Sequence, residues 1–146
     1  MAEHSLWRFS RALHRAINDR QFGDIEAVID DDVDWVVHGP TDIFPYLGAR
    51  HGKHDVLETI RQISDTFKIR RFERETVVLG VDCAASMLRC SLTVRGFDKP
   101  MSLRAAQFAH FKAGQLVGMR VLVDTLDLVE QALDQHIQFP NVTAQG

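Results

Sequence analysis

The chain of 146 residues has only two cysteines, Cys83 and Cys90, which are too few for a disulfide framework. If both lie on one extended strand, they point to opposite faces and are roughly 23 Å apart, at about 3.3 Å per residue. A disulfide between them is then impossible. The cysteine content therefore gives no sign of an oxidising compartment, and we expect the protein to be cytoplasmic.

Long apolar runs and basic clusters are also missing. Each apolar run is only a few residues long, so no segment could cross a membrane. Residues 1–8 include an acid and lack the apolar core of a secretory signal. The 17 basic and 20 acidic residues give a net charge of −3, and no basic run is longer than Arg70 and Arg71. Neither nucleic acid nor a membrane is an expected partner.

The remaining composition is that of a folded domain. Hydrophobic residues make up 45% of the chain and charged residues 25%, which argues against disorder. The length suits one domain with a sizeable core. Because the sequence has no internal repeat, low-complexity stretch or linker, we expect residues 1–146 to form a single domain.

Helical spacing dominates the first half of the sequence. A first amphipathic helix is predicted before Gly23, with an apolar stripe of Leu6, Phe9, Leu13, Ala16 and Ile17. A short second helix would bury Ile25, Val28 and Ile29 and stop at the acidic residues 30–32, which we interpret as a solvated turn rather than a metal site. A third helix is predicted over residues 54–67.

Strand formers lie between and after these helices. Residues 33–38 predict a strand, and residues 39–52 a long loop that contains Pro40, Pro45, Gly48 and Gly52. From residue 70 the apolar period changes to two, which predicts strands near 70–80, 84–95, 101–112 and 115–123, and Asp124 would cap a final helix. Helices followed by hairpin-linked strands favour an α+β fold, with the helices packed on one face of the sheet.

Alternation within the strands separates an inner face from an outer one. One set of alternate positions is apolar, and the other carries Arg89, Arg104 and Arg120 together with Phe108. An unpaired buried arginine costs several kcal/mol, whereas each buried aliphatic side chain contributes about 1.5–3 kcal/mol. We therefore expect the arginines on the outer face and the apolar set on the inner, concave face.

Three segments resemble SnoaL-like proteins of the nuclear transport factor two-like superfamily, whose relatives include ketosteroid isomerases and limonene epoxide hydrolases. They are WVVHGP at 35–40, YLGARHG at 46–52 and GQLVGMRVLVDTLD at 114–127. The resemblance implies a cone, in which a strongly curved, mostly antiparallel sheet wraps around three N-terminal helices and a C-terminal helix closes the fold. It also implies a pocket at the wide end and homodimers that form through the outer sheet face.

The catalytic residues of these relatives do not carry over. The arginine and two aspartates of the epoxide hydrolases fall on Leu88, Cys90 and Val121, which cannot act as that acid or base. The proton-shuttling aspartate of the isomerases falls on or beside Val37. Their tyrosine comes from the first helix, whereas the only tyrosine here, Tyr46, lies in the long loop. The resemblance therefore predicts the fold far better than the activity.

Several polar residues remain as candidates. Trp35 could orient a ligand or simply pack in the core, and Gln107 could contact a ligand or bond to a neighbouring strand. His38, His51 and Tyr46 are candidate acids or bases if the loop folds over the cavity mouth. Cys90 has no basic neighbour on its face and is expected to be an inert core residue. No metal or cofactor is expected, because His51 and His54 have no adjacent third ligand.

Three hypotheses follow. The first is a domain that binds a small apolar molecule; the second is an isomerase, cyclase, dehydratase or epoxide hydrolase that uses His38, His51, Tyr46 or Asp42; the third is a homodimeric interaction module. The predicted dimer face contains Arg89, Arg104, Phe108 and Arg120. The predicted pocket is lined by Trp35, Val37, Phe44, Phe67, Leu88, Cys90, Leu92, Leu103, Ala105, Gln107, Met119 and Val121.

Overall fold

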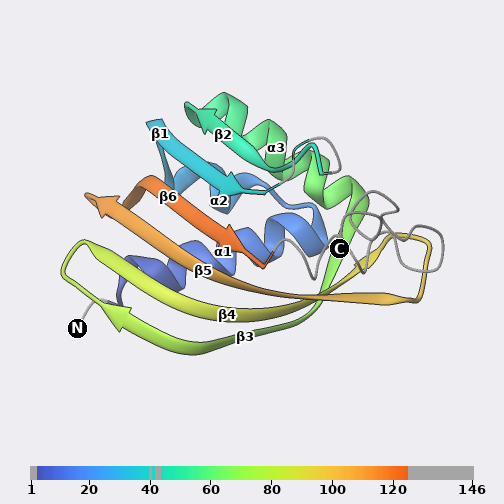
Figure 1. Cartoon of the computed structure of the whole chain (residues 1–146). Coiled ribbons are helices and arrows are strands. Elements are labelled where there is room, and N and C mark those ends of the chain that lie inside the picture. Colours follow the sequence, from blue (N-terminus) through green and yellow to red (C-terminus); the bar gives the residue numbers. More distant parts are fainter. Residues whose placement is uncertain (1–2, 40, 42–43, 125–146) are drawn as a thin grey trace, which may run out of the picture.

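The computed structural model describes residues 3–39, 41 and 44–124 (Figure 1). In chain order these residues form α1 (Ser5–Asp19), α2 (Gly23–Ala27), β1 (Ile29–His38), β2 (Gly48–His51), α3 (Lys53–Thr66), β3 (Phe67–Leu79), β4 (Cys83–Val94), β5 (Pro100–Lys112) and β6 (Gln115–Val123). Pro40, Asp42 and the helix predicted after Asp124 lie outside the described residues.

The strands form one sheet in the order β2-β1-β6-β5-β4-β3. Strands β3 to β6 make an antiparallel meander, β2 pairs antiparallel with β1, and β1 pairs parallel with β6. The sheet curves and stays open, with the three helices on its concave side (Figure 1). The predicted α+β cone with a mostly antiparallel sheet is therefore confirmed for the described residues.

The first strand begins earlier than predicted. Residues 30–32 were expected to form a turn, but they belong to β1, so that prediction was wrong. The pairing of β1 with β6 shifts register between Ile29 and Asp34, and the N–H of Asp32 donates to the Asp30 carboxylate at 2.9 Å. At this irregularity the side chains of Asp31 and Asp32 are both exposed. The acidic residues can therefore form a strand without burying their charges.

Two further boundaries differ from the prediction. The expected loop over 39–52 ends in β2, a short edge strand that pairs Val37 with Gly48 and Asp34 with His51. Helix α3 ends at Thr66, and Phe67 is the first residue of β3, where it pairs with Val94. Phe67 has extended backbone angles (φ −122°, ψ 157°). It was predicted as the last residue of the helix, but it belongs to the strand.

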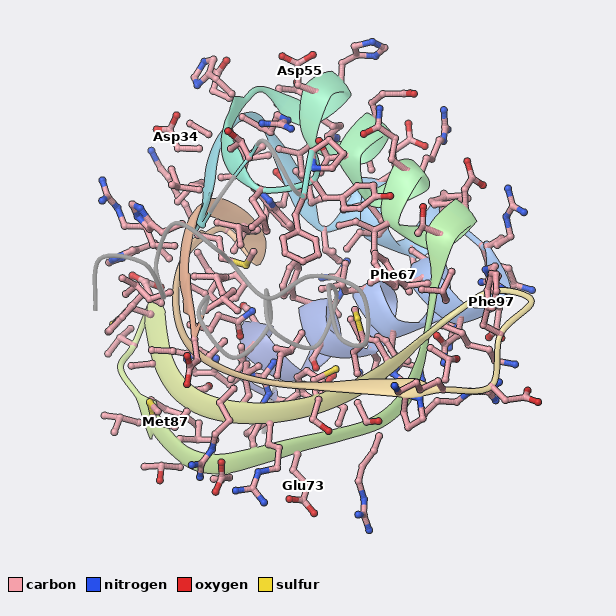
Figure 2. The ribbon with its side chains drawn as sticks, turned by 45° about the vertical axis from the view of Figure 1, so that its right-hand side comes forward. Asp34, Asp55, Phe67, Glu73, Met87 and Phe97 are labelled. Atoms are coloured by element: carbon pink, nitrogen blue, oxygen red, sulfur yellow. The ribbon has the colours of Figure 1, made fainter. Side chains whose placement is uncertain are left out.

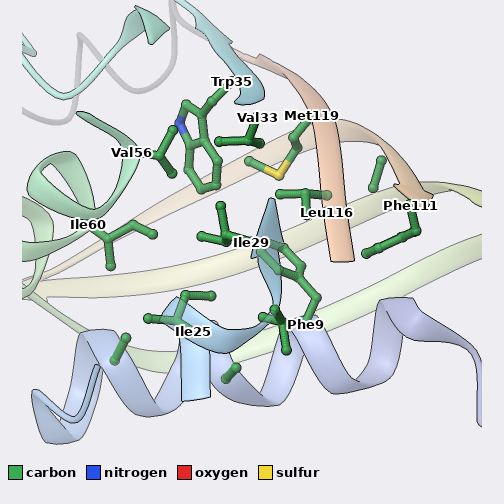
Figure 3. Close-up of a cluster of buried hydrophobic side chains, with 14 of the residues drawn as sticks. Phe9, Ile25, Ile29, Val33, Trp35, Val56, Ile60, Phe111, Leu116 and Met119 are labelled. Atoms are coloured by element: carbon green, nitrogen blue, oxygen red, sulfur yellow. The ribbon is translucent and has the colours of Figure 1, made fainter. Parts of the chain in front are cut away.

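The helices pack onto the concave face through one core. Helix α1 buries the predicted stripe positions Leu6, Phe9, Ala16 and Ile17, and Figure 3 shows Phe9 in the same cluster as Trp35 and Met119. None of the described helices is long and apolar enough to cross a membrane.

Arg95, just after β4, ties two helix ends to the sheet. Its Nε donates to the carbonyl of Ser64 at 2.6 Å, and its Nη2 donates to the carbonyl of Ile17 at 2.8 Å. The last carbonyls of a helix have no partner within the helix. One guanidinium therefore donates hydrogen bonds to carbonyls in the last turns of both α1 and α3.

The two faces of the sheet separate as expected. Leu88 and Cys90 are each 6% exposed on the concave face, whereas Arg89 and Arg104 lie on the convex face within 3.8 Å and 3.2 Å of the Glu75 carboxylate. Figure 2 shows Phe67 inside the curve and Met87 pointing away from it. The predicted placement of the two arginines outside is thus confirmed.

Candidate functional site

The part of the concave face next to residues 44–47 is apolar. Phe44 is 8% exposed and packs against four half-buried side chains: Leu47, Met101, Leu103 and Val123. The ring of Tyr46 meets the ring of Phe67 edge-on at 5.6 Å, and its hydroxyl shares a hydrogen bond with Thr66 Oγ1 at 2.7 Å. Aromatic pairs prefer this geometry, and Arg50 Nη2 also donates to the Pro45 carbonyl at 2.8 Å, so the segment is held by packing and by hydrogen bonds to α3 and β2.

Trp35 carries an unpaired hydrogen-bond donor. Its side chain is almost fully buried, and Nε1 has no hydrogen-bond partner; no other described side-chain nitrogen or oxygen is both buried and unpaired in this way. Figure 3 shows the indole between Val56 of α3 and Met119 of β6, with the nitrogen on the side of Val56. An orphaned buried donor costs about 1–3 kcal/mol, so this N–H is a natural point for a ligand acceptor.

Gln107 belongs to a polar network that also includes Arg74, a residue that sequence reasoning missed. Arg74 Nη1 donates to Gln107 Oε1 at 2.8 Å and to Ser86 Oγ at 2.9 Å, and its Nη2 donates to Ser10 Oγ at 3.2 Å. Gln107 Nε2 in turn donates to Met119 Sδ at 3.4 Å. The buried amide therefore finds its partners in Arg74 of β3 and Met119 of β6, and its oxygen orients an arginine on the concave face.

The remaining predicted pocket residues also lie on the concave side. Ala105 and Met119 are buried, and the side chains that are half-buried are Val37, Leu92, Leu103 and Val121. This surface is therefore mainly apolar, and Trp35 and the Arg74 network supply its hydrogen-bonding groups.

Cys90 is buried on the concave face, and burial raises the pKa of its thiol to about 11. A thiolate is therefore strongly disfavoured near neutral pH, in agreement with the predicted core role.

We expect a thiol reagent such as Ellman's reagent at pH 8 to modify only the exposed Cys83 quickly in the native protein. Cys90 should react only after unfolding in denaturant, and a Cys83→Ser variant should show almost no fast phase. Rapid native labelling of Cys90 in that variant would show that the thiol is open to solvent.

The three catalytic candidates do not come together. His38 is exposed at the end of β1, and His51 projects from β2 on the convex side, where its Nδ1 lies 2.7 Å from Asp34 Oδ1. Tyr46 faces Thr66 and Phe67 near the apolar end of the concave face. A general acid and base must reach the same substrate, so these residues do not form one site in this arrangement.

The convex face has a shallow hollow of its own. It measures about 490 Å³ and is lined by Asp34, His51, Phe108, His110 and Arg120, among others. The hydrogen bond from His51 to Asp34 raises the pKa of His51, and the charge of Asp34 adds to the shift. This contact stabilises the fold below the unfolded pKa of His51, and the effect is lost as the pH rises through the raised value.

We expect an NMR titration to show a higher pKa for His51 than for a solvated histidine. Asp34→Asn should lower the pKa of His51 toward its ordinary value, because the variant removes both the hydrogen-bond acceptor and the charge that raise it. An unchanged His51 titration in this variant would mean that the pair does not form in solution.

The described residues contain no group of three or more histidine, cysteine or acidic side chains that could hold a metal ion. In particular, the pair His51 and His54 gains no third ligand there.

The curved sheet, its concave helices and its apolar inner face define an α+β cone of the NTF2-like class. A model of the SnoaL-like domain matches residues 10–119, so the chain belongs to the SnoaL-like family. No curated protein matches the chain.

Solved structures agree with this assignment. One is described as a "Putative Isomerase" from Rhodopseudomonas palustris; it is 56% identical over 92% of this chain and 100% of its own, with a TM-score of 0.90. An NTF2-like protein from Burkholderia xenovorans is 17% identical, covers 86% of this chain and 91% of its own, and has a TM-score of 0.71. An LEH-like epoxide hydrolase from M. tuberculosis is 11% identical over 97% of both chains, with a TM-score of 0.69. The last two share only the fold.

Proposed function

We propose that the protein binds a small, largely apolar molecule against its concave face, and that an oxygen of this molecule accepts a hydrogen bond from Trp35 Nε1. The unpaired buried indole N–H is the observation that carries the proposal. Ligand pockets are mostly apolar and fix orientation with a few polar groups. A neutral carbonyl or ether oxygen would satisfy this donor at little desolvation cost.

Two single substitutions test this proposal. Trp35→Phe keeps an aromatic ring but removes the donor, whereas Trp7→Phe makes the same change on α1. With acetophenone, benzylacetone and cyclohexanone as probes, we expect measurable binding by calorimetry and a rise in melting temperature. Trp35→Phe should weaken binding about fivefold, the value of one neutral hydrogen bond, and Trp7→Phe should not.

The unliganded Trp35→Phe protein should stay folded, because removing an unsatisfied buried donor offsets part of the stability that the smaller ring loses in core packing. If all three probes fail to bind the wild type, or if both variants bind them equally well, the proposal is wrong.

Catalysis is a second candidate, and it is favoured by the name of the 56% identical relative, "Putative Isomerase". Of the three predicted acids and bases, only Tyr46 lies beside the apolar end of the concave face. In such an enzyme its hydroxyl would donate to a substrate carbonyl in place of Thr66. Tyr46→Phe should then lower turnover of an isomerisable enone at least about tenfold, whereas Thr66→Val should not.

We also propose that the protein forms a homodimer through the convex face. Met87, Phe108 and Leu122 are 47%, 44% and 51% exposed on the adjacent strands β4, β5 and β6. Exposed apolar patches of this kind commonly mark interfaces. Arg104 and Glu75 sit beside the patch, and a two-fold axis would let each arginine meet the partner's carboxylate.

Sedimentation should show a dimer for the wild type at micromolar concentration. Phe108→Glu should convert it to a monomer, because the change places two like charges in an apolar interface. Phe97→Glu, at a site after β4 that is 68% exposed against 44% for Phe108, should leave the dimer intact. A monomeric wild type would contradict the interface.

A further inference from the structure

Arg74 is a cation on the concave face that has no acidic partner among the residues the structure describes. All three of its hydrogen-bond partners are neutral side-chain oxygens, and no described carboxylate lies within ion-pair distance of it. Arg89 and Arg104 on the convex face share Glu75, whereas none of the described carboxylates forms an ion pair with Arg74. Burial lowers the pKa of Arg74, which means that the surroundings disfavour its charge.

The hydrogen bonds around Arg74 leave donors unused. A guanidinium has five N–H donors, and three hydrogen bonds to protein acceptors are formed. Ser10 and Ser86 accept from Arg74, so the protons of their hydroxyls remain free to turn toward another acceptor. A group of unused donors around a positive charge is complementary to an anion with two acceptor oxygens, such as a carboxylate.

The surroundings of Arg74 suit the rest of an amphipathic molecule. On β4 it pairs with the buried Leu88, and the buried Cys90, which pairs with Phe72, lies two residues further along that strand on the same face. The guanidinium lies 5.1 Å from the ring centre of Phe72, which is 37% exposed. Arg74 itself is half-buried, so its head group is reachable while its surroundings are apolar. Such an environment strengthens a charge-assisted hydrogen bond.

We propose that Arg74, with Ser10 and Ser86, binds the carboxylate of a small amphipathic monocarboxylate whose apolar part lies along the concave face. This inference rests on the proposed function, because it assumes that this face holds a small molecule, and it adds the charge class of that molecule. Gln107 is a positioning residue in this site, since its amide oxygen fixes one edge of the guanidinium.

A purely structural role is the alternative. Arg74 joins α1, through Ser10, to β4 and β5, and a tie of this kind would need no ligand. The two roles differ in what Arg74→Met does to ligand selectivity. A structural tie predicts lower stability and no change in the preference between a carboxylate and its neutral amide.

The test uses pairs of probes that differ only in charge: each straight-chain acid from butanoate to dodecanoate, phenylbutyrate, and their primary amides. Affinities are measured by calorimetry on the full chain at neutral pH. We expect the best carboxylate to bind wild type at least about tenfold more tightly than its amide. Arg74→Met should remove this preference, Arg74→Lys should restore part of it, and Arg104→Met should retain it.

Each result decides something. Equal affinity of acid and amide for the wild type would overturn this inference while leaving the proposed function standing. Failure of every acid and amide to bind would overturn this inference and count against the proposed function as well. A preference that survives in a folded Arg74→Met variant, shown by an unchanged circular dichroism spectrum, would assign carboxylate binding to another site.

Discussion

Replacing Phe9 with alanine is expected to lower the free energy of unfolding by about 3–5 kcal/mol. Phe9 is 1% exposed at the centre of the core, and its ring meets Phe111 edge-on at 6.3 Å. The change removes the apolar contacts of a whole ring and leaves a cavity between α1 and the sheet. Urea denaturation monitored by circular dichroism gives this free energy directly.

Phe97→Ala is the matched control for this prediction. Phe97 is 68% exposed in the turn after β4, so the same chemical change there should cost no more than about 0.5 kcal/mol. Equal losses for the two variants would mean that α1 does not cover the sheet as described.

Arg95→Met is expected to lower the free energy of unfolding by about 3 kcal/mol. The variant keeps most of the side-chain length but removes the donors to the carbonyls of Ile17 and Ser64. Those carbonyls lie in the last turns of α1 and α3, where the helix supplies no other donor. Both helix ends should therefore loosen together, which amide hydrogen exchange would detect as faster exchange in both last turns.

Arg104→Met provides the control for Arg95. Arg104 is exposed and pairs with Glu75 on the convex face, and surface ion pairs contribute little, about 0–1 kcal/mol. If Arg104→Met destabilised the monomer as much as Arg95→Met, the special role of Arg95 would be refuted.

The sequence predicted the parts of the fold that follow regular periods. In β4 and β5 the apolar and charged positions alternate cleanly, and Leu88 and Arg89 lie on the faces predicted for them. The hairpin between β5 and β6 was also predicted, at Ala113 and Gly114. Both residues have positive φ, 52° and 80°, as a tight two-residue hairpin turn requires.

On β3, irregular pairing with β4 prevents the alternation of residues from predicting which side chains point inward. Its pairing with β4 shifts register between Ile69 and Arg71 and again between Arg74 and Thr76. Each shift moves later side chains to the other face, so a strict period of two does not reveal that Arg74 points inward. The unbroken apolar run at 77–79 was the one available signal of such an irregularity.

The candidate site was predicted only in part, for a related reason. Burial of Trp35 and Gln107 could be expected from their apolar neighbours, but their hydrogen-bond partners depend on residues far apart in the sequence. His51 was placed in a loop over the pocket, whereas β2 pairs with β1 and turns it toward Asp34 on the convex face. An edge strand of four residues has too little pattern to be recognised in advance.

The indole resonances of the two tryptophans test the central claim most directly. In a proton–nitrogen correlation spectrum of labelled protein titrated with benzylacetone, the Trp35 indole signal should move downfield as its N–H gains an acceptor, while the Trp7 signal should stay in place. A Trp35 signal that does not shift while the probe demonstrably binds would contradict the account, because the ligand would then lie elsewhere on the molecule.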